Sequence, residues 1–159
     1  MDKLLTLLEN DSTLTSAQIA AMLDKEEGDI KKAIAAYEKD GVILGYKTLI
    51  DWDKTDREYV SAMIELKVIP ERVGGFDKIA EKIYSYPEVQ SVYLMSGGFD
   101  LSLIIEGRTL KEVATFVAQK LAPIENVTAT ATHFVLKKYK DKGVIYDAPE
   151  KDERGKLSI

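Results

Sequence analysis

The sequence predicts an α+β fold in which an N-terminal winged helix-turn-helix domain is joined by an extended linker to a ferredoxin-like domain. Three short helical patterns with tight connections occupy the first fifty residues. After a polar stretch at residues 51–58, the apolar pattern changes to strands and helices in the order β-α-β-β-α-β. We therefore expect domains at residues 1–50 and 59–138, followed by a C-terminal tail at residues 139–159.

The first domain begins with two short helical patterns. Leucines repeat at helical spacing after Asp2, which predicts a first helix that stops near Asn10. Thr15 and Gln18 have the spacing of a capping box, in which each side chain bonds the backbone N–H of the other residue, so a second helix is expected there. Its apolar face would hold Ile19, Met22 and Leu23.

A third helical pattern follows almost at once. Asp24 and Glu27 repeat the capping signature, and Gly41 suits the left-handed conformation that often follows a helix C-terminus. The stripe expected to be buried consists of Ile30, Ala33, Ile34 and Tyr37. Three helices with this spacing are typical of a helix-turn-helix, whose last helix lies in the major groove of DNA.

The opposite face of the third helix is the candidate DNA-binding surface. Small residues there would let the backbone approach DNA, and lysines would reach phosphates. On a helical wheel this outward face contains three cations and no anion. A solvated surface is the plainer interpretation of the same lysines. The residues expected to contact DNA are Gly28, Lys31, Lys32, Ala35 and Lys39.

Acidic residues argue against strong DNA binding by a single chain. Glu26, Glu27 and Asp29 crowd the start of the third helix, where they either stabilise the helix dipole or accept a hydrogen bond from cytosine. The whole chain has a net charge of −5, whereas DNA-binding proteins usually present a basic field. Useful affinity would therefore require several copies held in one assembly.

The linker and the second domain follow from a change of period. β-branched and aromatic residues between Gly41 and Ile50 predict a linker strand. A capping box at Thr109 and Glu112 opens the second helix of the C-terminal domain. Strands are expected at 60–68, 89–95, 99–105 and 127 to about 138, helices at 76–83 and 110–121, and a tight turn at Gly97-Gly98.

Both helices of a ferredoxin-like domain cover one face of its sheet, so the other face needs a partner. Tyr59, Ser61, Met63 and Tyr93, or their neighbours of opposite parity, would form a broad surface on that face. Such a surface is too apolar to remain in water, and packing of one sheet on another in a homodimer is the expected solution.

Composition makes an enzyme the minority hypothesis. The chain has no cysteine and one histidine, so we expect no metal site, no cofactor and no catalytic residues. His133 is expected to be a hydrogen-bonded packing residue rather than a catalytic base. No phosphate-binding glycine motif, membrane-spanning apolar run or secretory signal is found, so a cytoplasmic protein without membrane contact is expected.

Three sets of residues resemble the Lrp/AsnC (feast/famine) transcription regulators over roughly residues 2 to 138. One is the leucine-rich start after Asp2, and another is the G-x-[aromatic]-D-L turn from Gly97 to Leu101. The third is the linker motif with Tyr37, Gly41, Val42, Ile43, Gly45 and Tyr46. Two departures are the acidic start of the third helix and its lysines, where the family usually has serines and arginines.

The resemblance implies a DNA-binding dimer that assembles into an octamer or a similar disc. It also implies a small effector, commonly an amino acid, bound between dimers and biasing the assembly. The effector site would then comprise Ser96, Gly97, Gly98, Phe99, Asp100, Thr130 and Thr132. Glycine N–H groups would hold the carboxylate and Asp100 the ammonium, although a simple turn in which Asp100 caps backbone donors is the alternative.

Two rival functions remain open at this stage. The first is a ligand-sensing protein-interaction module with weak or lost DNA binding. The second is an enzyme similar to the sirohaem decarboxylases, which combine a similar helix-turn-helix with a similar second domain and use histidine. In the tail, residues 144–146 are expected to dock on a neighbouring subunit, residues 150–159 to be mobile, and a DNA contact by the basic tail is a further alternative.

Overall fold

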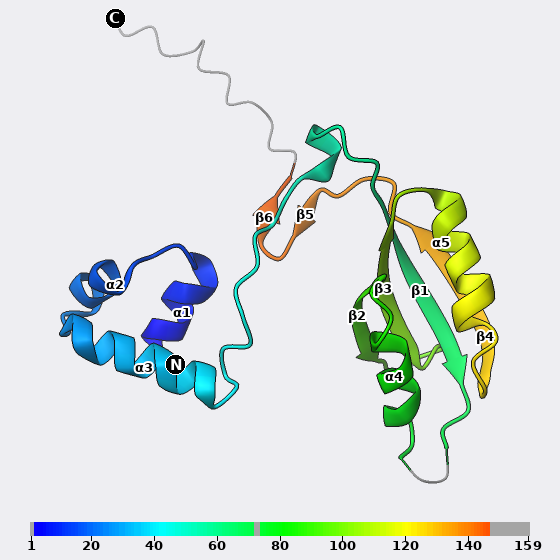
Figure 1. Ribbon diagram of the computed structural model, residues 1–159, viewed down its shortest axis with the longest axis horizontal. Coiled ribbons are helices and arrows are strands. Elements are labelled where there is room, and N and C mark those ends of the chain that lie inside the picture. The colour runs from blue at the N-terminus through cyan, green and yellow to red at the C-terminus, as the bar shows by residue number, and fades with distance from the viewer. Residues whose placement is uncertain (1, 72–73, 147–159) are drawn as a thin grey trace, which may run out of the picture. The chain divides into compact units, whose positions relative to one another are not determined.

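The computed structural model describes residues 2–71 and 74–146, and the chain divides into two compact units, Met1–Ile50 and Asp51–Ile159 (Figure 1). In the described residues no helix is long and apolar enough to cross a membrane.

The first unit consists of three helices, α1 (Lys3–Asn10), α2 (Ser16–Leu23) and α3 (Glu27–Lys39). Their shared core contains Leu4, Leu8, Ile19, Ala20 and Ile30. The predicted stripe of α3 is confirmed, since Ile30 is buried and Ala33, Ile34 and Tyr37 pack against this core. The Tyr37 hydroxyl donates a hydrogen bond to Asp2 at the start of α1, which joins the first and third helices.

The capping signals of the first unit are partly confirmed. Thr15 and Gln18 form the predicted capping box, in which the Thr15 hydroxyl accepts from the Gln18 N–H at 3.2 Å. The box predicted at Asp24 is wrong, because Asp24 is the left-handed C-cap of α2, with a φ of 53°. An aspartate tolerates this conformation, and it turns the chain between α2 and α3. Glu26 precedes α3 without a capping side-chain bond.

Gly41 ends α3 as predicted, but the wing and the linker strand are not formed. Gly41 has a φ of +71°, and the Val42 N–H bonds the Tyr37 carbonyl at 2.9 Å. Residues 44–50 form no strand. A strand needs a neighbour for its backbone N–H and C=O groups, and the first unit supplies only helices.

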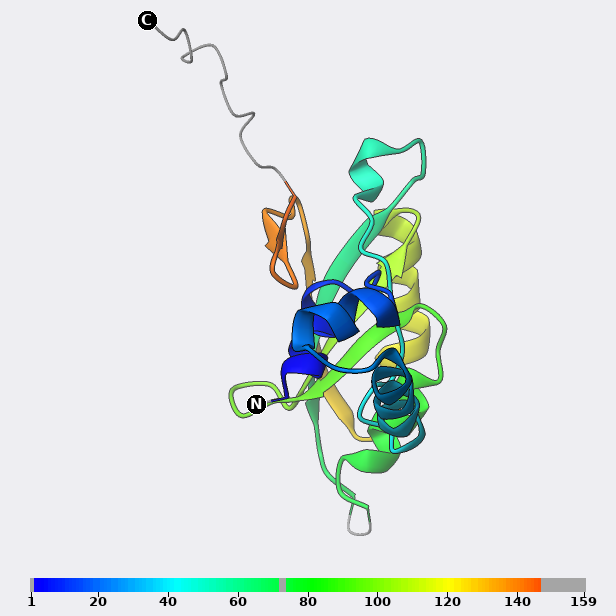
Figure 2. The ribbon, with the colours of Figure 1, turned by 90° about the vertical axis from the view of Figure 1, so that its left-hand side faces the viewer.

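The second unit has the predicted β-α-β-β-α-β order. It comprises β1 (Val60–Val68), α4 (Asp77–Tyr84), β2 (Val89–Leu94), β3 (Leu101–Gly107), α5 (Leu110–Phe116) with a continuing turn η2 (Val117–Leu121), and β4 (Val127–Phe134). The antiparallel sheet has the order β2-β3-β1-β4, so β1 is bonded on both sides. Figure 2 shows α4 and α5 on one side of this sheet.

Alternate residues of β1 separate the two faces of the sheet. Ala62, Ile64 and Leu66 are fully buried in a core that includes Ile83 of α4 and Val113 of α5. The intervening residues of β1 lie on the opposite face, which neither α4 nor α5 covers (Figure 2). We call this the open face.

The C-terminal part of the second unit differs from the prediction. The last strand ends at Phe134 rather than near residue 138, and residues 140–145 form a hairpin of β5 (Lys140–Asp141) and β6 (Val144–Ile145). Its turn has positive φ at Lys142 (44°) and Gly143 (85°), as a tight type I′ hairpin requires. The predicted mobile segment at 150–159 lies outside the described residues.

Gly107 sets the distance between β3 and α5. A Cβ atom on Gly107 would lie 2.9 Å from Cγ2 of Val113, which is buried in the core. We expect Gly107→Ala to destabilise the second unit by about 1–3 kcal/mol, because the added methyl group overpacks this contact.

Urea unfolding followed by the fluorescence of Trp52 measures the effect, since this only tryptophan lies in η1 (Trp52–Lys54) of the second unit. Gly98→Ala is the matched control, because a Cβ on Gly98 has no neighbour within 4 Å. Equal unfolding midpoints for the two variants would show that the contact is not tight.

Candidate functional site

The predicted DNA-contact residues lie on one exposed surface of α3. Gly28, Lys31, Lys32, Ala35 and Lys39 are all exposed, on the side away from the buried Ile30. A Cβ on Gly28 would meet no described atom within 4 Å, so this position at the start of the helix is open.

Two of these lysines are paired with acids of the same helix. The Lys31 ammonium lies 2.7 Å from the Glu27 carboxylate, and the Lys32 ammonium lies 3.9 Å from that of Asp29. The expectation of a surface with three cations and no anion is therefore wrong. Side chains three and four residues apart meet on a helix, so the acids reach the lysine-bearing face.

The predicted effector residues 96–100 lie in a loop of six residues rather than a tight turn. β2 ends at Leu94, β3 begins at Leu101, and the Met95 N–H bonds the Asp100 carbonyl at 2.8 Å. Ser96, Gly97 and Gly98 are exposed and form no hydrogen bond with other described residues.

Asp100 is bound to β1 rather than free in this loop. Its Oδ2 accepts from the Val68 N–H at 2.8 Å, and its Oδ1 lies 3.3 Å from the Lys67 ammonium. The pairing of β1 with β4 shifts in register between Lys67 and Val68, so the Asp100 carboxylate satisfies a backbone donor at an irregularity. The bond from Val68, and to a lesser extent Lys67, lowers the pKa of Asp100 against the opposing effect of desolvation.

Thr130 and Thr132 are not brought against this loop within one chain. They pair with Leu66 and Ile64 of β1, on the side of the sheet that carries the core. Leu101, which follows Asp100, pairs with Leu66 from the other side of β1. Two strand spacings, roughly 10 Å, therefore separate Thr130 from the end of the loop.

The open face carries apolar residues around a contact between a histidine and a carboxylate. Met63, Tyr93 and Val135 are exposed there, as expected for a face that requires a partner. His133 is hydrogen-bonded as expected, with its Nε2 3.0 Å from the Glu65 carboxylate, but its side chain is exposed rather than packed. The sequence did not indicate this pair, because its two members are brought together only by the pairing of β1 with β4.

A lysine between two tyrosines joins β1 to the C-terminal hairpin. The Lys138 ammonium donates to the Tyr59 hydroxyl at 3.0 Å and lies 5.9 Å from the Tyr146 ring centre. Tyr59 in turn donates to Glu106 at 2.8 Å. Desolvation lowers the pKa of Lys138, but the bond to Tyr59 and the nearby tyrosines and Glu106 outweigh it, so that pKa is raised.

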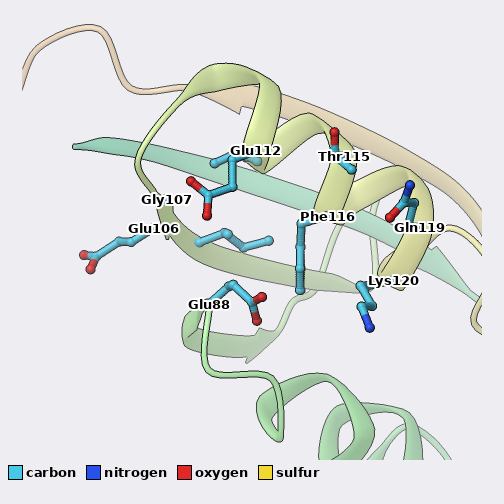
Figure 3. A pocket seen from close by; sticks show the side chains of 10 residues that line it. Glu88, Glu106, Gly107, Glu112, Thr115, Phe116, Gln119 and Lys120 are labelled. Carbon is cyan, nitrogen blue, oxygen red and sulfur yellow. The ribbon is translucent and has the colours of Figure 1, made fainter. Parts of the chain in front are cut away.

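A groove of about 180 Å³ lies beside α5 and was not predicted (Figure 3). Its floor is apolar, and its acidic residues come from three segments, so no local motif indicated it. In Figure 3, Glu88, Glu112 and Phe116 border the groove, while the Glu106 carboxylate lies apart from them. The lining residues are Glu88, Ile105, Glu106, Gly107, Glu112, Val113, Thr115, Phe116, Gln119 and Lys120.

No metal-binding arrangement of His, Cys, Asp or Glu is found among the described residues. The candidate surfaces among these residues are the α3 surface, the 95–100 loop, the open face and the groove beside α5.

Comparison with known proteins agrees with this arrangement. Residues 61–145 match the family model of the Lrp/AsnC ligand binding domain, which is more than half of the chain. The HTH-type transcriptional regulator YugG of Bacillus subtilis is 44% identical over 153 residues, which cover 96% of this chain and 92% of that protein.

Two solved structures share the fold at low sequence identity. The transcriptional regulator NMB0573 from Neisseria meningitidis, in complex with L-methionine, has a TM-score of 0.72 at 20% identity and covers 89% of this chain and 93% of its own. The feast or famine regulatory protein Rv3291c from M. tuberculosis, complexed with L-methionine, has a TM-score of 0.71 at 19% identity and covers 87% and 90%. On the family match and the relative that spans nearly its whole length, this chain belongs to the Lrp/AsnC family of transcriptional regulators.

Proposed function

We propose that the protein binds double-stranded DNA through α3 and that a small effector, an amino acid, biases its assembly and hence its DNA affinity. The observation that carries the proposal is the exposed α3 surface, in which small residues and three lysines lie opposite the buried stripe. The full-length similarity to an HTH-type regulator supports it.

The chemistry of α3 favours contacts with phosphates over recognition of guanine. Lys31, Lys32 and Lys39 supply point charges, and the helix has no arginine, asparagine or glutamine for a bidentate contact with a base. Gly28 and Ala35 allow a close approach of the backbone. Binding by a single copy is therefore weak and depends strongly on salt.

We expect Lys31→Met/Lys32→Met to weaken DNA binding and to reduce the slope of log K against log salt by about 2, because two phosphate contacts are lost. Fluorescence anisotropy with a random-sequence duplex, at 50 to 200 mM salt, measures this. Lys82→Met/Lys111→Met, with exposed lysines of the second unit, is the charge-matched control. Equal slopes for the two double variants would contradict contact through α3; a wild type that binds no DNA but does bind an amino acid would favour the ligand-sensing module.

For the effector we propose the loop at 96–100, with Thr130 and Thr132 contributed through assembly. The exposed N–H groups of Gly97 and Gly98 suit a carboxylate. Asp100 already serves Val68 and Lys67, so we assign it the positioning of the loop rather than the primary contact with the ammonium group. Similarity to two methionine-bound regulators supports an amino acid as the ligand class.

The role of Asp100 predicts a pH dependence. Its folded pKa lies below the ordinary value of 3.8, so its contribution to stability is complete above that value and is lost as the pH falls through the folded pKa. We expect Asp100→Asn to be less stable than the wild type at pH 7, and we expect the difference to shrink as the pH falls below 3.8.

Urea unfolding followed by Trp52 fluorescence across this pH range gives the comparison. Asp77→Asn, which removes another exposed carboxylate of the second unit, is the control for the loss of one negative charge. A constant difference between Asp100→Asn and the wild type at every pH would assign the effect to shape rather than charge.

Assembly is proposed to start at the open face. Met63 lies on the central strand β1, between Ile104 of β3 and His133 of β4, and is 42% exposed. Burial of this face against a second copy would remove its apolar side chains from water without moving the core.

We expect Met63→Lys to weaken self-association roughly 30-fold or more, as a charge at the centre of an interface does. Sedimentation equilibrium measures the change. Leu110→Lys, on the exposed side of α5, is the matched control because its side chain is 56% exposed on the covered side of the sheet. Dissociation of the control but not of Met63→Lys would place the interface elsewhere.

A further inference from the structure

The lysines at the start of α3 are not available to DNA on their own. Lys31 and Lys32 are each paired with an acid of the same helix, at 2.7 Å and 3.9 Å. All four side chains are about half or more exposed. Exposed pairs of this kind are weak, so a phosphate can replace the carboxylate as the lysine's partner.

This exchange leaves a carboxylate beside the DNA. From Glu27 to Lys39, the helix carries three lysines and three acids, Glu27, Asp29 and Glu38, so its formal charge is zero. When Lys31 moves to a phosphate, Glu27 loses its partner and faces the phosphates at short range. The acid therefore opposes binding to any duplex, whatever its sequence.

The base that lies opposite the acid decides whether this repulsion is relieved. In the major groove, a carboxylate can accept a hydrogen bond from the amino group of cytosine or adenine, and every base pair has one of these two groups, on one strand or the other. A site that presents such an amino group to Glu27 or Asp29 gives the carboxylate a partner in place of its lysine. Gly28, between the two acids, has no side chain to hold them away from the bases.

We propose that Glu27 and Asp29 are specificity-determining residues that penalise binding to arbitrary DNA and favour sites in which a cytosine or adenine amino group lies at the position that faces each carboxylate. This inference rests on the proposed binding of DNA through α3. It differs from a role in helix stability, because acids in the first turn also interact favourably with the helix dipole, and that interaction needs no DNA.

The test uses Glu27→Gln in the full-length chain. Glutamine keeps the size of the side chain and a carbonyl acceptor but removes the negative charge. Glu9→Gln is the matched control, since Glu9 is an exposed acid of α1 in the same unit. Thermal unfolding establishes that each variant is folded, and Asp29→Asn provides the same test if Glu27→Gln is not.

The probes are a random-sequence duplex and a duplex selected from a random pool by the wild-type protein. At 50 mM salt we expect Glu27→Gln to bind the random duplex about 3- to 10-fold more tightly, since a negative charge within a Debye length of several phosphates is removed. The preference for the selected duplex should fall by at least the same factor. Glu9→Gln should change neither the affinity for random DNA nor the preference by more than about 2-fold, because salt screens a charge that is farther than a Debye length from the phosphates.

The outcomes separate this inference from the proposed function. Unchanged or weaker binding of random DNA by Glu27→Gln, beside measurable binding by the wild type, overturns the inference alone. An equal gain in Glu9→Gln also overturns it, because the effect would then belong to net charge. If neither the wild type nor any variant binds DNA at 50 mM salt, the proposed function fails and the inference fails with it.

Discussion

The double pairing of β1 is the constraint on which the second unit depends. Because β1 is bonded to β3 on one side and β4 on the other, its register fixes which residues of three strands share a face. Ile64 and Leu66 then direct one face into the core, and Met63 is left on the open face. A shift of one residue would exchange the two faces and expose the core.

Local patterns predicted most of the fold, and errors arose where distant residues decide the structure. The alternation along β1 and the capping box at Thr15 act within a few residues, and both are confirmed. Asp24 was misassigned because an aspartate suits both the start of one helix and the end of another. Only the packing of α2 against α3 distinguishes the two positions. The predicted linker strand does not form because a strand requires a neighbouring strand. The C-terminal hairpin was not predicted because the contact that holds it, from Lys138 to Tyr59, joins residues far apart in sequence.

In the candidate site too, local patterns identified the segments but not the contacts between distant residues. A helical wheel identifies the exposed residues of α3. It gives the direction of each side chain but not how far the side chain extends, so it did not predict the contact of Glu27 with Lys31. The G-x-[aromatic]-D pattern located the loop, whereas the partner of Asp100 is Val68, 32 residues earlier in the chain. The groove beside α5 depends on the approach of Val113 to Gly107, which no local pattern encodes.

These features suggest how an effector at the loop would influence assembly. Asp100 bonds β1 through its carboxylate and through its own N–H, which donates to the Leu66 carbonyl at 2.9 Å. The same strand carries Met63 on the open face. A ligand that reorganised the loop would therefore act directly on the strand that presents the proposed interface, with no need for a longer path. In the proposed function, α3 has no net charge, so its affinity for DNA would depend on the number of copies in the assembly, and a modest change in association would be enough to alter that affinity.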